Sequence, residues 1–156
     1  MISYFIYAIS ITFGSWLIGL ILNIIISKTT YYSKLSNFNF ITSKKANKAI
    51  GLKPFKWIVE NTFFKFFNQK INLKDKTVEL SEIRKEMTYA EIGHLIAFVF
   101  VTIVALYKSF THSFLLGLTL MIVNIILNLY PSLLQQENKR RIDRLIKIQN
   151  RKRNKS

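Results

Sequence analysis

The sequence predicts an all-α fold, namely a small integral membrane protein with about three transmembrane helices and a basic, aromatic loop at the cytoplasmic face or membrane interface. Two observations predict it. Half of the 156 residues are hydrophobic, yet Lys and Arg (23) outnumber Asp and Glu (8), for a net charge of +15. The apolar residues gather in long uncharged runs, and the basic residues lie between and after them. The chain has room for one membrane domain, residues 1–156, and this composition excludes a disordered chain.

The first predicted span covers residues 4–26. No charged residue occurs between Tyr4 and Ile26, and a helix of this length, rising ~1.5 Å per residue, crosses the ~30 Å hydrocarbon core. A cleaved signal peptide is the less favoured interpretation, because the segment has no basic residue before it and no clear cleavage site.

Two further spans are predicted at residues 87–107 and 114–134. The second of these is uncharged throughout. The uncharged run at 95–107 is too short to cross a membrane alone, so a spanning helix has to begin near Met87 and include Glu91 and His94. A re-entrant or interfacial segment is the alternative for this stretch.

The basic residues predict how the spans are oriented. Residues 28–88 carry 13 Lys and Arg, the connection at Lys108 carries one, and residues 137–156 carry nine, which accounts for all 23. The positive-inside rule then places the loop 28–86 and the tail 137–156 in the cytoplasm. We therefore expect a multi-pass protein of the cell membrane, with its N-terminus outside and its C-terminus in the cytoplasm.

The loop and the tail both favour contact with lipid. Residues 54–59 and 62–67 interleave aromatic residues with Lys, a pattern typical of segments at the headgroup boundary, although packing of the rings into a soluble core is the alternative. The basic tail directly follows a span, where it anchors the topology and attracts anionic lipids. We expect membrane lipids as partners and no nucleic acid. A polyanionic coenzyme A thioester can use the same charge.

Ionisable residues at membrane depth are the candidates for chemistry, because burying a charge there costs roughly 2.5–3.5 kcal/mol. Glu91 and His94 are three residues apart and share a helix face. Counted from Met87, they lie ~6 and ~10 Å deep, and Asn128 lies ~9 Å deep counted from Leu134. Hydrogen bonding between helices is the alternative use of these residues.

Metal or cofactor chemistry is not expected. The chain has no Cys and two His, of which His112 falls near the opposite membrane face, so a zinc site cannot be completed. Neither a glycine-rich phosphate loop nor a nucleophile elbow occurs.

Several segments resemble the glycosyl-4,4'-diaponeurosporenoate acyltransferase family. They are, in chain order, residues 38–40 (Phe-Asn-Phe), 86–94 with an Ala-Glu-x-x-His core, 128–131 with Asn and Pro, and 135–141 with a Gln-x-x-Asn pattern and basic ending. The chain departs from the family pattern in four ways: Leu95 stands where a Trp is usual, Ile41 stands where a Glu is usual, residues 63–70 match the family's Trp/Arg/Lys-rich stretch only loosely, and the last Pro is one residue out of step.

The resemblance implies a membrane acyltransferase of carotenoid biosynthesis, which transfers a fatty acyl group to the hydroxyl of a lipid or carotenoid glycoside. Acyl-CoA or a similar thioester is the expected donor. His94 is the predicted general base and Glu91 orients it, as catalytic residues. The predicted substrate-binding residues are Asn128, Gln135, Asn138 and Arg141. Two alternatives remain open, a non-catalytic membrane subunit and a lipid- or pigment-binding protein, which use the same polar residues as contacts between helices.

Overall fold

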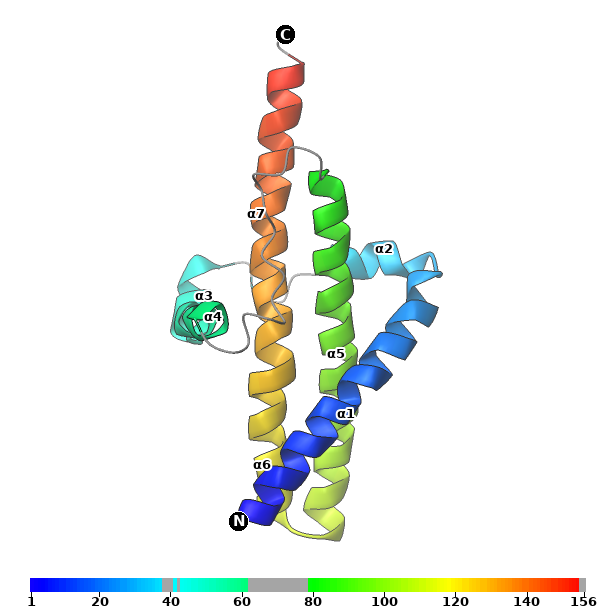
Figure 1. Ribbon diagram of the computed structural model, residues 1–156, viewed down its shortest axis with the longest axis vertical. Coiled ribbons are helices and arrows are strands. Elements are labelled where there is room, and N and C mark those ends of the chain that lie inside the picture. The colour runs from blue at the N-terminus through cyan, green and yellow to red at the C-terminus, as the bar shows by residue number, and fades with distance from the viewer. Residues whose placement is uncertain (38–40, 42, 62–78, 155–156) are drawn as a thin grey trace. The chain divides into compact units, whose positions relative to one another are not determined.

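The chain folds almost entirely into helices. In the computed structural model, which describes residues 1–37, 41, 43–61 and 79–154, 90% of the described residues are helical and none lies in a strand. The elements are α1 (Ile2–Ser27), α2 (Tyr31–Ser36), α3 (Lys44–Ala49), α4 (Leu52–Asn61), α5 (Leu80–Thr111), α6 (Phe114–Asn124), the π-helical segment η2 (Ile125–Leu129) and α7 (Tyr130–Arg153) (Figure 1). The predicted all-α class is confirmed.

Three helical stretches among the described residues are long and apolar enough to cross a membrane. They are Ile2–Ser27, Leu80–Thr111 and the continuous run Phe114–Lys152. Each predicted span lies inside one of them. The middle segment belongs to one uninterrupted helix of 32 residues, which is what a full span requires and a re-entrant turn does not. These helices indicate a membrane protein.

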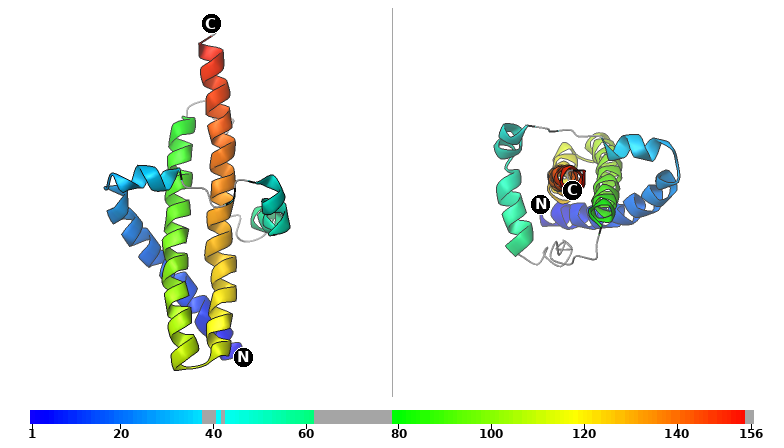
Figure 2. Two further views of the ribbon diagram at one scale, coloured as in Figure 1. Left: turned by 180° about the vertical axis from the view of Figure 1, so that it is seen from behind. Right: turned by 90° about the horizontal axis from the view of Figure 1, so that it is seen from above.

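The described structure divides into two compact units. The first contains α1, α2, the part of α5 from Tyr89 onward, α6, η2 and the first residues of α7 as far as Ser132. Within this unit α1 runs obliquely across α5 and α6 (Figures 1 and 2). Small residues permit the crossing: a Cβ placed on Gly19 would lie 2.4 Å from the backbone oxygen of Gly93. Close backbone approach at glycine is a common way for helices to pack in membranes.

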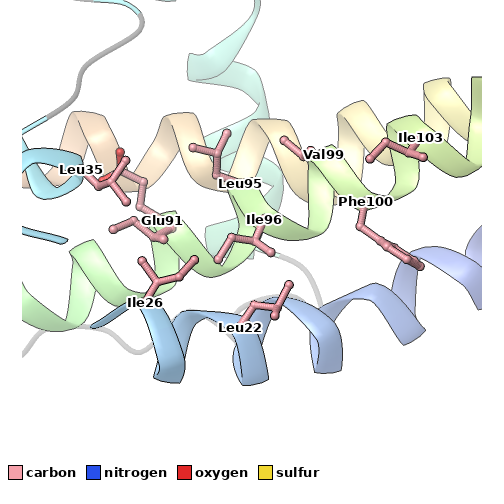
Figure 3. Close-up of a pocket in the computed structure, with 10 residues that line it drawn as sticks. Leu22, Ile26, Leu35, Glu91, Leu95, Ile96, Val99, Phe100 and Ile103 are labelled. Carbon is pink, nitrogen blue, oxygen red and sulfur yellow. The ribbon is translucent and has the colours of Figure 1, made fainter. Parts of the chain in front are cut away.

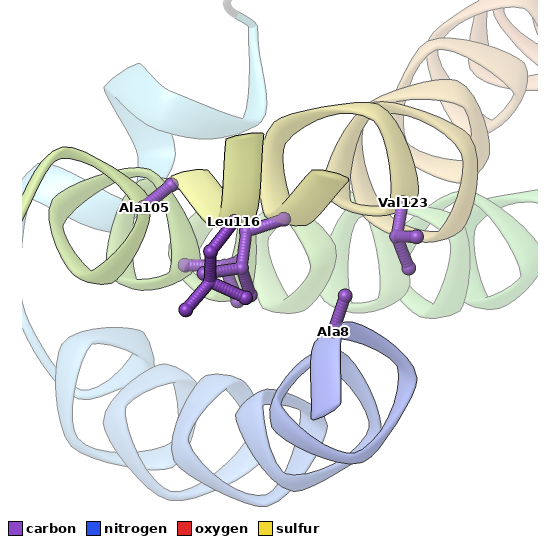
Figure 4. Packing of buried hydrophobic residues seen from close by; sticks show 6 residues of the cluster. Ala8, Ala105, Leu116 and Val123 are labelled. Carbon is purple, nitrogen blue, oxygen red and sulfur yellow. The ribbon is translucent and has the colours of Figure 1, made fainter. Parts of the chain in front are cut away.

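A cluster of buried aliphatic side chains holds the three long helices of this unit together (Figure 4). Its members are Ala8 on α1, Val101 and Ala105 on α5, and Leu116, Leu120 and Val123 on α6. Lipid tails are as apolar as these side chains, so close van der Waals packing, rather than transfer out of water, stabilises the contact.

The connection between α5 and α6 is short and capped. After α5 ends at Thr111, the Ser113 side chain accepts a hydrogen bond from the Leu116 backbone N–H at 3.2 Å and begins α6. Further along, α6 passes into the π-helical segment η2, just before Pro131. A proline lacks the N–H that a regular helix donates four residues back, and the wider π turn lies where that bond to Leu127 is missing. Asn128 sits inside this turn.

The second unit contains α3, α4, the part of α5 up to Thr88 and α7 from Leu133 onward. Ile83, Met87 and Ile142 form its buried apolar cluster, and Arg84 forms an ion pair with Asp143. Arg140 donates a hydrogen bond to the Ile41 backbone oxygen at 2.7 Å. Thus α7 continues as a packed helix through much of the basic tail.

The aromatic loop is described in part. Residues 54–59 belong to α4, which buries Leu52 and leaves Trp57 64% exposed and Ile58 42% exposed. Trp57 therefore does not pack into a core within the described residues. Residues 62–67 and the Phe-Asn-Phe element at 38–40 lie outside the described residues, and the position of the loop at the membrane interface stays a prediction.

Candidate functional site

Glu91 and His94, the two predicted catalytic residues, lie one turn apart on α5. Glu91 is 2% exposed. His94 is partly buried, and its ring meets the Trp16 ring edge-on, with the ring centroids 5.9 Å apart and the planes at 89°. His94 Nδ1 is buried and has no hydrogen-bond partner among the described residues. This ring nitrogen can therefore accept a hydrogen bond from a ligand or bind a proton.

Asn128 is the centre of a hydrogen-bond network next to this histidine. Its Oδ1 accepts from Trp16 Nε1 at 2.9 Å, and its Nδ2 donates to Asn124 Oδ1 at 2.8 Å and to Ser15 Oγ at 3.3 Å. Asn124 in turn donates to the Phe98 backbone oxygen at 3.0 Å. The network joins α1, α5, α6 and η2, and it uses both N–H groups of the Asn128 amide.

An apolar groove runs along one face of α5 (Figure 3). It has a volume of about 370 Å³. Its walls are one face of α5 between Glu91 and Ile103, Leu22 and Ile26 of α1, and Leu35 of α2. Glu91 lies at one end of the groove beside Leu35, and Ile103 lies at the opposite end (Figure 3). Glu91 is the one ionisable residue in this lining.

Glu91 and His94 therefore face different surroundings. Glu91 lines the groove, whereas His94 is not part of its lining and faces Trp16 instead. Side chains three residues apart on a helix have Cβ atoms about 5–6 Å apart.

The other predicted substrate-binding residues belong to the second unit. Gln135 and Asn138 are partly buried on α7. Arg141 is exposed, and it forms an ion pair with Glu137 at 2.8 Å, one turn earlier on the same helix.

Sequence reasoning identified Asn128 but missed that it belongs to a buried polar stripe along the third span and α7. Asn124, Asn128, Ser132, Gln136 and Lys139 recur at intervals of four or three residues, and none is more than 2% exposed. This spacing is visible in the sequence. The family resemblance instead pointed to Gln135 and Asn138, which directly precede the buried residues Gln136 and Lys139.

Two further polar residues near Glu91 were also missed. Asn23 of α1 is fully buried, and its Nδ2 donates to the Tyr89 backbone oxygen at 2.8 Å. Burial raises the pKa of the Tyr32 phenol above its usual value, with Tyr89 and Glu91 adding to the effect and Asn23 opposing it. The phenol on α2 is therefore an electrostatic neighbour of Glu91. Asn23 continues the series Thr12, Ser15 and Gly19, which is buried on α1. Their regular spacing in the sequence indicates that they share one helix face.

Comparison with known proteins identifies the family. The model of the glycosyl-4,4'-diaponeurosporenoate acyltransferase family matches residues 28–148, well over half of the chain. No curated protein and no solved structure gives a significant match. The matched region contains both predicted catalytic residues, Asn128 and the basic start of the tail. The chain, an all-helical membrane protein with a buried Glu91 and a nearby His94, belongs to the glycosyl-4,4'-diaponeurosporenoate acyltransferase family.

Proposed function

We propose that this protein is a membrane-bound acyltransferase that esterifies a hydroxyl of a lipid or carotenoid glycoside with a fatty acyl group. Acyl-CoA or a similar thioester is the donor, and no cofactor is needed. One observation carries the proposal: a buried carboxyl and a histidine lie one turn apart on a helix long enough to span, and the carboxyl also lies at the end of an apolar groove. Family membership supports acyl transfer as the reaction.

In the proposed reaction, neutral His94 takes the proton of the acceptor hydroxyl as the hydroxyl oxygen attacks the carbonyl carbon of the thioester. A C–O bond forms and the carbonyl oxygen becomes an oxyanion. Collapse of this intermediate breaks the C–S bond, and the imidazolium returns the proton to the leaving thiolate. Glu91 orients the ring and stabilises its charged form while the hydroxyl is ionised.

The polar residues around this pair take different parts in the proposal. Both Asn128 N–H groups are engaged within the protein, so Asn128 contributes mainly by holding Trp16 against the His94 ring, and it contacts substrate only if one of these bonds opens. Gln135, Asn138 and Arg141 bind polar parts of the substrates. Under the predicted topology they lie on the cytoplasmic side, where a phosphate-bearing donor arrives.

A non-catalytic membrane subunit, or a lipid- or pigment-binding protein, is the second candidate. The hydrogen-bond network around Asn128 favours it, because such networks commonly stabilise helix association in bilayers without any chemistry. The two candidates differ at His94. A structural histidine needs a hydrogen-bonding group, whereas a general base needs a group that binds a proton.

Substitution of His94 by Gln separates them. Gln keeps a hydrogen-bonding side chain but cannot act as a base, and loss of a general base costs about a hundred-fold to ten-thousand-fold in rate. We expect His94→Gln to be expressed and inserted in the membrane, while the acylated glycolipid disappears from lipid extracts analysed by mass spectrometry. Glu91→Gln is expected to lower the product in the same direction, but less.

The matched control is His112→Gln, the same substitution at the exposed end of α5, where His112 contacts the edge of Tyr4. It is expected to leave the acylated lipid at the wild-type level. Full product from His94→Gln would exclude the base role. Loss of the protein from the membrane in every His94 and Glu91 variant would assign both residues to structure.

A further inference from the structure

The groove beside α5 has the dimensions of a lipid chain. Glu91 and Ile103 mark its ends (Figure 3), and 12 residues of helix between them correspond to about 18 Å. One leaflet contributes half of the ~30 Å hydrocarbon core, about 15 Å, and leaflets are built from fatty acyl chains. An extended chain advances about 1.2 Å per single bond, so the groove accommodates about 15 bonds.

Buried polar side chains lie behind the lining at the Glu91 end of the groove. Asn23 and Tyr32 are not lining residues, but a side-chain hydrogen bond from Asn23 and the charge of Glu91 both act on the Tyr32 phenol. Tyr32 lies three residues before Leu35 on α2, and Asn23 lies three residues before Ile26 on α1. Residues at this spacing share a helix face, and both Leu35 and Ile26 line the groove. The two polar groups thus belong to the same end as Glu91.

We propose that this groove binds the fatty acyl chain that is transferred, with the carbonyl at the Glu91 end and the methyl end toward Ile103. This assignment rests on the acyltransferase function proposed above. At the polar end the Tyr32 O–H donates a hydrogen bond to the acyl carbonyl oxygen, which also stabilises the oxyanion that follows. A tyrosine phenol, with its usual pKa of about 10, is protonated at neutral pH, and burial raises the pKa of Tyr32 further. The carbonyl then lies one helical turn from His94.

The groove holds one acyl chain of limited length. It stops after about 15 bonds, so its far end sets the longest chain that fits.

Tryptophan substitutions along the groove test this assignment. Val99 and Ile103 are 52% and 62% exposed, so a larger side chain at either position fills the groove without entering the packed core. Ile103→Trp is expected to remove the longest acyl chains from the product. Val99→Trp lies one turn nearer to Glu91, about 6 Å, and is expected to shorten the longest accepted chain by about five more carbon atoms.

Leu106→Trp is the matched control. Leu106 is 55% exposed, lies on the same side of α5 and falls beyond the groove, so its product is expected to keep the wild-type chain-length profile. An unchanged profile in Val99→Trp, with the amount of product also unchanged, would exclude the groove as the acyl site. Less product with an unchanged profile would instead indicate that the acceptor occupies it, which also overturns the assignment.

A binding measurement separates this assignment from the proposed chemistry. Palmitic acid carrying a photoreactive diazirine is added to membranes that contain the wild-type chain, His94→Gln or Val99→Trp. We expect labelling of α5 peptides around residues 95–103 in the first two and several-fold less in Val99→Trp. Labelling of His94→Gln without product formation supports both proposals. Equal labelling of wild type and Val99→Trp would overturn the groove assignment whatever His94 does.

Discussion

At the scale of single residues, the carboxyl of Glu91 and the imidazole of His94 lie in different surroundings. Glu91 is buried at the end of an apolar groove, and His94 meets Trp16, which Asn128 holds by a hydrogen bond. A carboxyl and an imidazole in different surroundings are an arrangement typical of acid–base sites, because each environment sets the proton affinity of its own group.

Asn128 gives the residue-scale prediction. Replacing Asn128 by Leu keeps the branching of the side chain and removes the Asn128 hydrogen bonds with Trp16, Ser15 and Asn124. Interhelical hydrogen bonds in membranes average about 0.6 kcal/mol and reach about 2 kcal/mol. We therefore expect Asn128→Leu to lose about 1–3 kcal/mol of stability, measured as a lower midpoint of thermal unfolding in detergent.

Asn150→Leu is the control for this measurement, since Asn150 is exposed on α7, and its midpoint is expected to stay near that of the wild type. If Asn128→Leu unfolds at the wild-type temperature but makes no acylated product, Asn128 is a substrate contact and not a structural one.

The sequence could predict Glu91, His94 and Asn128, because ionisable and amide side chains at membrane depth are rare and their spacing gives their depth. It could not predict that Glu91 lines a groove while His94 faces Trp16. Those contacts depend on where α1 and α2 cross α5, and no local pattern encodes that position. The proximity of Asn23 and Tyr32 to Glu91 could not be predicted for the same reason, because both are more than fifty residues away from it in the chain.

At the scale of helices, small residues decide how closely α1 and α5 approach. The buried positions of α1 are Ala8, Thr12, Ser15, Gly19 and Asn23, at intervals of three or four residues. The spacing of these residues is visible in the first predicted span. Lipid contact already explains a long apolar run, so the spacing alone does not predict a contact between helices. The crossing at Gly19 brings α1 against α5 beside the candidate site.

Gly19 gives the prediction at this scale. A Cβ at position 19 would lie 2.4 Å from the Gly93 backbone oxygen and 3.2 Å from its carbonyl carbon, and backbone atoms cannot rotate away as a side chain can. The helices have to separate, at a cost of about 1–3 kcal/mol. We expect Gly19→Ala to dissociate α1 from the bundle at a lower SDS concentration than the wild type, measured by the fluorescence of Trp16 in chains that carry Trp57→Phe.

Gly14→Ala is the matched control on the same helix, because a Cβ at Gly14 meets nothing within 4 Å. It is expected to match the wild type or to be slightly more stable, since Ala favours helix over Gly. Equal effects of the two substitutions would show that helix propensity, and not the crossing, is responsible.

Helix boundaries could be predicted less well than helix positions. The middle helix begins at Leu80, seven residues before the predicted span, and α7 continues to Arg153 through the basic tail. Hydropathy marks where a chain enters apolar solvent, not where its helix starts. Contacts outside the apolar runs extend these helices, among them the packing of Ile83 and Met87 on Ile142 and the pair of Arg84 with Asp143.

For the whole molecule, three candidate spans and an uneven charge distribution predict how the chain crosses the bilayer. The loop 28–88 and the tail hold 13 and nine basic residues, and the connection after α5 holds Lys108 alone. Lys108 lies over the rings of Tyr7 and Tyr107, 5.8 Å from each centroid, in an aromatic group typical of an interface. The N-terminal end of α1 and the connection thus share one side of the first unit.

Cysteine labelling tests this topology without background, because the chain has no Cys of its own. A membrane-impermeant maleimide is expected to label Ser109→Cys in intact cells and to label Ser81→Cys and Ser156→Cys only after permeabilisation, since 22 of the 23 basic residues lie on the side that the positive-inside rule assigns to the cytoplasm. Ser81 and Ser109 lie near the two ends of α5 (Leu80–Thr111), so the two positions report on the two ends of one helix. Labelling of Ser81→Cys from outside would invert the orientation, and labelling of both from the same side would mean that α5 does not span. Either result would overturn the predicted topology, which places Glu91 and His94 in the cytoplasmic half of the bilayer.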